Sequence, residues 1–112
     1  MGEKILIEAG RLDVKAYKNA DFGLTLSEFD FELSEYNFYA QLKDKRNTVI
    51  ATFEIEQGSD NLVILMRRAV LNDIPDGIYY YDLKRVSDDA TAWENIIMQG
   101  KFEVVSGVTI LP

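Results

Sequence analysis

The chain has 112 residues, of which 47% are hydrophobic, and this length and composition suit a single globular domain with one modest core. Its formal net charge of −7, with basic residues scattered along the chain, argues against binding to nucleic acid or to an anionic membrane. Cysteine and histidine are both absent, which excludes disulfides, thiolate chemistry, zinc–thiolate sites and the usual catalytic triads.

The first half of the chain predicts short strands separated by turns. Residues 1–10 contain the apolar run 4–8, which predicts either an edge strand or an N-terminal arm that reaches a neighbouring molecule. Alternating apolar and polar residues then predict three half-buried strands. Their inward residues are Leu12, Val14 and Ala16, then Phe22, Leu24 and Leu26, then Phe38, Ala40 and Leu42. Residues 27–35 fit either a strand or an irregular loop, and we favour the loop.

The most regular alternation in the chain lies at residues 49–56 and predicts one strand. Its inward residues are Val49, Ala51, Phe53 and Ile55. Turn-forming residues at 44–47 and 57–61 flank this strand, and residues 62–66 predict the next one. Residues 68–74 could form a single helical turn that Pro75 ends.

The segment from Ile74 to Leu83 is the most informative stretch of the sequence. Pro75 and Gly77 predict a tight turn, and β-branched and aromatic residues follow it. A tyrosine two residues after such a glycine is typical of the corner at which immunoglobulin-like sandwiches enter a late strand. We therefore expect the hydroxyl group of Tyr79 to donate a hydrogen bond back to this turn.

The last part of the chain predicts one long strand at residues 94–105. Ile96, Met98, Phe102 and Val104 share the inward face of this strand. Gly100 lies within it and indicates a bulge or a close approach of another backbone segment. Residues 108–110 predict one more edge strand.

These segments add up to seven to nine strands with turn signals between them. The pattern predicts an all-β fold, a two-sheet immunoglobulin-like β-sandwich with mostly antiparallel strands and at most one short helical turn. We expect residues 1–112 to form this single domain. No apolar run suits a secretory signal or a membrane span, so we expect a chain that is made in a cytoplasm.

Few groups in this sequence could carry chemistry. The acids at 88–89 and the turn at 57–61 could offer oxygens to calcium, but their spacing is that of ordinary turns and not of a calcium loop. No glycine-rich phosphate loop is present. A pair of acids for hydrolysis cannot be placed from the sequence. We therefore expect no enzyme, no catalytic residues, no cofactor and no metal.

Several strands carry apolar residues on both faces, and this predicts a contact surface. Tyr39, Tyr80 and Ile97 lie opposite the inward residues of their strands, and surplus apolar surface of this kind indicates a permanent partner. The alternative is that loops cover these residues. Trp93 could be a contact anchor or a plug that closes the end of the sandwich. Tyr80 could also stack against a sugar or a base, although a cross-strand contact explains it more simply.

The order of these segments resembles a known family. Residues 21–26 (Asp-Phe-Gly-Leu-Thr-Leu), 39–42 (Tyr-Ala-Gln-Leu), 75–83 (Pro-Asp-Gly-Ile-Tyr-Tyr-Tyr-Asp-Leu) and 100–109 (Gly-Lys-Phe-Glu-Val-Val-Ser-Gly-Val-Thr) follow one another. This set resembles the small immunoglobulin-like structural proteins of tailed bacteriophages and prophages. Proteins of that family occur in the tail, the baseplate or the head–tail region, and as the N-terminal domain of baseplate upper proteins.

The resemblance implies a structural component of the virion that has no catalytic residues. Its implied partners are other virion proteins and copies of itself, and its implied location is the virion, after synthesis in the bacterial host cytoplasm. Because no fibre domain follows Pro112, we expect a free-standing component. The alternative from the residues alone is a carbohydrate-binding module that uses Trp93 and Tyr80 as stacking surfaces.

Overall fold

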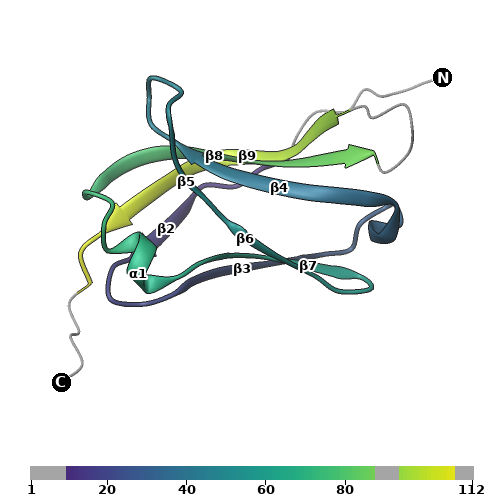
Figure 1. The fold of residues 1–112 in the computed structure, drawn as a ribbon, viewed down its shortest axis with the longest axis horizontal. Coiled ribbons are helices and arrows are strands. Elements are labelled where there is room, and N and C mark those ends of the chain that lie inside the picture. The colour runs from purple at the N-terminus through teal and green to yellow at the C-terminus, as the bar shows by residue number, and fades with distance from the viewer. Residues whose placement is uncertain (1–9, 88–93, 108–112) are drawn as a thin grey trace.

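The computed structural model describes residues 10–87 and 94–107 of the chain (Figure 1). Three features expected from the sequence lie outside the described residues. These are the strand or arm at residues 4–8, the side chain of Trp93 and the final edge strand at 108–110.

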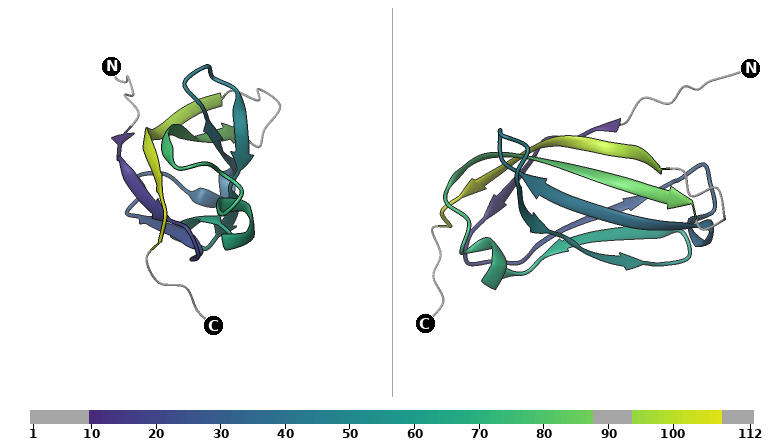
Figure 2. Two further views of the ribbon diagram at one scale, coloured as in Figure 1. Left: turned by 90° about the vertical axis from the view of Figure 1, so that its left-hand side faces the viewer. Right: turned by 45° about the horizontal axis from the view of Figure 1, so that its top comes forward.

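The described residues form two sheets that face each other (Figures 1 and 2). The larger sheet has the strand order β1-β9-β8-β4-β5, and β2 also pairs with β9. Its strands are β1 (Gly10–Arg11), β2 (Val14–Tyr17), β4 (Tyr36–Lys43), β5 (Val49–Thr52), β8 (Gly77–Ser87) and β9 (Glu94–Val105). The smaller sheet has the order β3-β7-β6, with β3 (Phe22–Ser27), β6 (Glu54–Gln57) and β7 (Asn61–Met66).

This arrangement is the immunoglobulin-like β-sandwich that the sequence predicts. The nine strands of the described residues pair antiparallel, except that β1 and β2 run parallel to β9. The helical turn expected after β7 is α1 (Arg68–Leu71). A second short turn, the 3-10 turn η2 (Leu33–Glu35), lies in the segment that we expected to be a loop, so the described chain has two helical turns where we expected at most one.

The core lies between the sheets and follows the predicted alternation along most strands. The inward residues of β4 and β7 are buried, as expected; they are Phe38, Ala40 and Leu42 in β4, and Leu62, Ile64 and Met66 in β7. Four aromatic rings meet near the middle of the core: Phe22, Phe53, Tyr81 and Phe102. Their centroids lie between 5.0 and 6.3 Å apart in tilted or edge-to-face pairs, the geometry that aromatic quadrupoles favour.

The corner before β8 has the predicted construction. The hydroxyl group of Tyr79 donates a hydrogen bond of 2.6 Å to the carbonyl oxygen of Pro75. Gly77 has a φ of +154°, a conformation that residues with a side chain rarely adopt. The corner therefore fixes the angle at which the chain enters its central strand, and the prediction for Pro75, Gly77 and Tyr79 is confirmed.

The single strand predicted at residues 49–56 is wrong, because the chain changes sheets within it. Residues 49–52 pair with β4 in the larger sheet, whereas residues 54–57 pair with β7 in the smaller one. Between them Phe53 is buried in the core, and its N–H donates to the carbonyl oxygen of Ala40 at 2.9 Å. The register of β4 and β5 also shifts beside Lys43, so Val49 is 47% exposed instead of facing inward.

The inward face predicted for β9 is wrong at its N-terminal end. Leu83 pairs with Met98 but Lys84 pairs with Ile96, so Ile97 is the extra residue of a β-bulge. The bulge reverses the alternation, and Ile96 is exposed while Ile97 packs against the core.

The close backbone approach expected at Gly100 is confirmed. A side chain at this position would collide with the carbonyl group of Leu12, in the segment between β1 and β2. The same carbonyl oxygen accepts a hydrogen bond of 2.6 Å from the hydroxyl group of Tyr81. Gly100 therefore lets β1 and β2 lie close against β9.

Candidate interaction surface

The outer face of the larger sheet is the candidate functional site, and we call it the outer face below. Strands β4, β8 and β9 form its centre, and every second residue of each strand points away from the core, except at the bulge in β9. Strand pairing places these outward residues in rows. Tyr39 lies beside Lys84, which lies beside Ile96. Four residues further along β4, Lys43 lies beside Tyr80, which lies beside Lys101.

Large apolar and aromatic side chains are exposed on the outer face. The exposed fractions are 54% for Tyr39, 48% for Ile78, 42% for Tyr80 and 37% for Ile96. Each of them alternates along its strand with a residue that faces the core, and β-branched and aromatic residues favour the strand conformation itself. The sequence therefore builds a strand in which both faces carry apolar groups.

Two ion pairs lie between these apolar side chains. The ammonium group of Lys84 on β8 lies 2.8 Å from a carboxylate oxygen of Glu94 on β9. The hydrogen bond to Glu94 raises the pKa of Lys84 above its usual value. Lys43 on β4 lies 3.6 Å from Asp82 on β8. Each pair joins neighbouring strands and places charges of both signs among the apolar side chains of the outer face.

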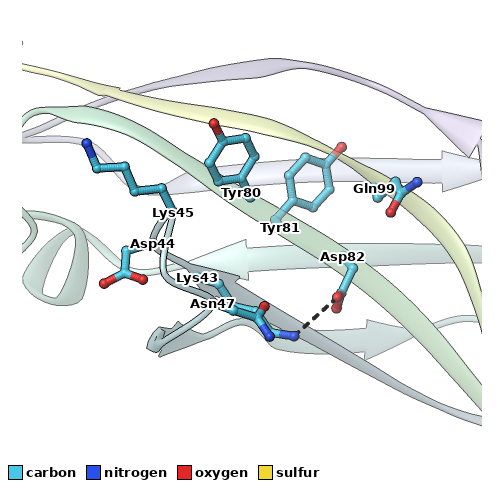
Figure 3. Close-up of a pocket in the computed structure, with 8 residues that line it drawn as sticks. All are labelled: Lys43, Asp44, Lys45, Asn47, Tyr80, Tyr81, Asp82 and Gln99. Atoms are coloured by element: carbon cyan, nitrogen blue, oxygen red, sulfur yellow. Dashed lines mark ion pairs between the residues drawn. The ribbon is translucent and has the colours of Figure 1, made fainter.

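Two shallow depressions occur on this face. One, of about 410 Å³, is lined by Tyr39, Ile96 and the Lys84–Glu94 pair, among others. The other, of about 320 Å³, lies where the β4–β5 turn meets β8 (Figure 3). Figure 3 shows the Lys43–Asp82 ion pair in this depression, with Tyr80 and Tyr81 on the strand beside it.

The β4–β5 turn that borders this second depression is ordered by its own side chains. The carboxylate of Asp44 accepts hydrogen bonds from the backbone N–H groups of Arg46 and Thr48, at 2.9 and 3.0 Å. Asn47 takes a positive φ of 66°, which asparagine tolerates better than most residues. The turn predicted at residues 44–47 is confirmed.

Tyr81 on β8 lines the second of these depressions. Burial raises the pKa of Tyr81 to about 12, and its hydroxyl group is engaged with the carbonyl oxygen of Leu12, so at neutral pH this group stays protonated. Among the described residues, no group of three or more acidic side chains is placed to hold a metal ion. No helix in the described part of the chain is both long and apolar enough to span a membrane.

The structure brings together two of the four side chains that the sequence predicts for the contact surface. Tyr39 and Tyr80 both lie on the outer face and come from neighbouring strands. Ile97 does not join them, because the bulge in β9 turns it towards the core. Trp93 lies outside the described residues.

Sequence reasoning missed two members of the outer face, Ile78 and Ile96. The alternation along β8 does place Ile78 opposite Tyr79, but a periodic pattern does not say how much of an outward side chain stays exposed. The alternation places Ile96 on the wrong face, because no residue type marks the bulge at Ile97. Gly100, four residues further on, marks the close approach of Leu12 and not this bulge.

No protein-family model matches the chain, and no curated protein matches its sequence. Among solved structures, one similar chain comes from the crystal structure of the titin M10–obscurin-like 1 immunoglobulin complex. It is 13% identical with a TM-score of 0.48, over 92% of this chain and 94% of that one. Another is the M1 domain from titin, at 11% identity and a TM-score of 0.42, over 88% of this chain and 92% of that one. Identities and TM-scores this low say nothing about the function of the present chain.

Proposed function

We propose that this chain is a non-enzymatic structural protein that assembles with other proteins through its outer face, as a component of a tailed-phage virion. The observation that carries the proposal is the outer face itself, where Tyr39, Ile78, Tyr80 and Ile96 are exposed on neighbouring strands. A sandwich that works alone needs only one apolar face for each of its strands.

The composition of the outer face matches that of a protein interface. Tyrosine and isoleucine supply apolar contact area, and tyrosine also offers a hydroxyl group at the rim. The Lys84–Glu94 and Lys43–Asp82 pairs stand between them and give the face a fixed pattern of charge. Such a pattern determines how a partner is aligned on the face, and it contributes less to the affinity of the complex.

The shape and charge of the face favour a protein partner over a small ligand. Its two depressions are shallow, whereas small-molecule sites bury most of their ligand in a cleft. The net charge of −7 disfavours nucleic acid and anionic lipid. Protein–protein contact is the function that remains best supported.

The virion setting is supported by the resemblance to tailed-phage structural proteins. Its motif segments fall on β3, β4, β8 and β9, and β4, β8 and β9 also form the centre of the outer face. On this proposal the partners are other virion proteins and further copies of the chain, and the protein resides in the assembled particle.

The test is the incorporation of this chain into particles. Tailed particles are purified from the producing culture, and the chain is quantified in them by mass spectrometry. We expect the wild-type chain in the particles and a loss of about tenfold or more for the Tyr39→Ala, Tyr80→Ala double variant, since buried tyrosines are frequent hot spots.

The control variant is Tyr17→Ala on β2, because Tyr17 is exposed to the same 54% as Tyr39 but lies at the edge of the sheet. Tyr17→Ala should be incorporated normally. Particles that lack the wild-type chain would contradict the virion role. Equal incorporation of all three chains would contradict the role of the outer face. Sugar binding that the double variant abolishes would favour the carbohydrate-binding alternative.

A further inference from the structure

The two edges of the smaller sheet are built differently. At one edge, β6 is short and places the charged residues Glu54 and Glu56 outward. Arg67 pairs with Glu54 at 3.3 Å, and the side-chain amide of Gln57 donates to the carbonyl oxygen of Leu33 at 2.8 Å. Charge and side-chain contacts of this kind protect an edge strand against pairing with another chain.

The opposite edge, β3, has none of these protections. It pairs with β7 over six residues without a register shift, and it contains neither a charged residue nor a proline. Its outward residues, Gly23, Thr25 and Ser27, are small. Among the described residues, no strand pairs with its other side. A straight, uncharged edge like this one is a template for a further strand.

The core beside β3 is also incompletely covered. Phe22, Leu24 and Leu26 face inward but stay half-buried. Their direct partners on β7 are Met66, Ile64 and Leu62, which are exposed by 2% or less. Across the gap between the sheets, Val14 on β2 is half-buried and Leu12 is 38% exposed. Incompletely buried apolar side chains therefore lie along β3 and along the segment that leads into β2.

We propose that this edge pairs with residues 4–8 of a second copy of the chain, which add a strand to β3. This segment reads Lys-Ile-Leu-Ile-Glu, so a β conformation puts Ile5 and Ile7 on one face and Lys4, Leu6 and Glu8 on the other. Ile5 and Ile7 are the right kind of side chain to cover the half-buried row of β3. Covering this row would remove apolar surface of both strands from water, which favours the pairing.

The path of the chain argues for a second copy over the chain's own residues 4–8. The turn at residues 18–21 joins the end of β2 to the start of β3. Traced away from this turn, β2 towards the N-terminus and β3 towards the C-terminus, both strands run towards the same end of the sandwich. The stretch from Tyr17 back to Gly10 is longer than β3, and Gly10 is still paired with Met98 on β9. Met98 lines a depression together with Leu26 and Ser27, the last residues of β3. The chain has thus reached the far end of β3 before residues 4–8 begin, and they would have to reverse direction to pair with it.

This inference goes beyond the proposed function and stands independently of it. It uses the β3 edge instead of the outer face, and it names the segment of a second copy that binds there. An unaltered outer face with a blocked β3 edge would still bind other virion proteins.

The experiment uses disulfide trapping, which is clean because the chain has no cysteine of its own. Chains that carry Thr25→Cys are mixed with tagged chains that carry Lys4→Cys, Leu6→Cys or Glu8→Cys, and the mixture is oxidised. All four positions face away from the core in the proposed pairing, and residues opposite each other on neighbouring strands are close enough for a disulfide. We expect at least one mixture to give a disulfide-linked heterodimer in high yield.

The matched control replaces Thr25→Cys with Glu56→Cys on the protected edge, and this mixture should give at least tenfold less heterodimer. A single chain that carries Thr25→Cys together with the cysteine of the best-yielding mixture distinguishes pairing within one chain from pairing between two copies. A disulfide within one chain, in a particle that light scattering finds monomeric, would overturn the proposal. The same holds if no mixture yields a disulfide.

A second measurement does not depend on engineered cysteines. The wild-type chain should be a dimer or a longer assembly by light scattering, and the Ile5→Asp, Ile7→Asp double variant should be a monomer with an unchanged far-UV spectrum. Thr25→Lys, which adds a charge to the edge, should have the same effect as the double variant. A wild-type chain that is monomeric at high micromolar concentration would also overturn the proposal.

Discussion

The two long sides of the sandwich connect the sheets in different ways. On one side, the closed side, β5 runs directly into β6 and Phe53 carries the backbone from one sheet to the other (Figure 1). On the other, the open side, β2 and β3 are joined only by a turn at one end. Phe53 is 4% exposed, whereas the inward residues of β3 are half-buried.

The difference shows what a covalent crossing does for a small core. A crossing strand closes the gap between the sheets without a further segment, because its own side chains fill that gap. The open side lacks such a crossing. The Tyr81–Leu12 hydrogen bond and the close approach at Gly100 fasten its β1–β2 segment to the larger sheet, and a network around Asp76 joins the β2–β3 turn to the residues after β9. Each of these contacts can be removed separately.

The largest effect is expected on the closed side. Phe53→Ala should lower the free energy of unfolding by about 3–5 kcal/mol, the usual cost of removing a buried phenylalanine. Its ring contacts those of Phe22, Tyr81 and Phe102, so the cavity opens in the middle of the core. Denaturant unfolding measures the change.

The comparison variant is Phe22→Ala on the open side, where the same kind of ring is only half-buried. In the Ile5→Asp, Ile7→Asp background, in which a second copy should not cover β3, Phe22→Ala should cost clearly less than Phe53→Ala, because less apolar surface returns to water. In the wild-type background the difference should be smaller, because the added strand covers the row that contains Phe22. Equal losses for the two variants in the Ile5→Asp, Ile7→Asp background would contradict an open side.

Phe53 also shows why the closed side could not be predicted from the sequence. Residues 49–56 alternate without a break, and the period of two is the same whether a strand stays in one sheet or moves to the next. The point of crossing is set by the strands on either side, β4 and β7, which offer separate partners to the two halves. Alternation predicts which side chains face inward, but it does not indicate to which sheet their strand belongs.

The second prediction concerns Gly100 on the open side. Gly100→Ala should destabilise by about 1–3 kcal/mol, because the new methyl group meets the backbone carbonyl of Leu12, which cannot yield as a side chain can. The matched control is Gly23→Ala, also within a strand, where the nearest atom is a side-chain methyl of Leu65 at 3.3 Å. Gly23→Ala should be neutral or slightly stabilising, since glycine is a poor strand residue. The reverse order of the two variants would contradict the close packing of β1 and β2 on β9.

Gly100 and Tyr79 are the two places where the sequence did predict a specific contact. In both cases one residue type has a property that no other shares: the missing side chain of glycine, and a phenol that follows a proline–glycine turn at a fixed spacing. Ile97 gave no such signal, because isoleucine suits an inward and an outward position equally well. The candidate surface could therefore be predicted for Tyr39 and Tyr80, but not for Ile96.

The third prediction removes the hydroxyl group that joins β8 to the open side. Tyr81→Phe should cost about 0.5–1.5 kcal/mol at pH 7, the usual net worth of one hydrogen bond. Burial raises the pKa of Tyr81 from 10 to about 12, so the fold favours the neutral phenol. The wild type should keep this contribution below pH 10 and lose it as the pH rises from 10 towards 12. The phenylalanine variant lacks that group, and its stability should converge with that of the wild type over this range. Parallel pH curves for the two chains would contradict the assignment.

The smallest effect is expected at Asp76, which ties the open end of the sandwich together. Its carboxylate accepts hydrogen bonds from the hydroxyl and the backbone N–H of Ser106, at 2.7 and 3.1 Å, and lies 3.1 Å from the ammonium group of Lys18. Lys18 is in the turn between β2 and β3, and Ser106 follows β9, so one side chain joins the two segments that leave the open side. These partners, Ser106 first and then Lys18, lower the pKa of Asp76 below its usual value of 3.8.

A lowered pKa means that the fold favours the carboxylate, so the stabilisation is present above pH 3.8 and is lost as the pH falls below that value. Asp76→Asn should therefore be slightly less stable than the wild type at pH 7, and the gap should close in acid, as thermal unfolding at a series of pH values would show. The control is Asp60→Asn, which replaces an exposed acid in the β6–β7 turn. The stability of this variant should fall in acid in the same way as that of the wild type. A stability of Asp76→Asn that falls in acid as steeply as that of the wild type would contradict this role of Asp76. The turn between β2 and β3 would then be the only connection at this end of the open side, and the two sides would differ even more.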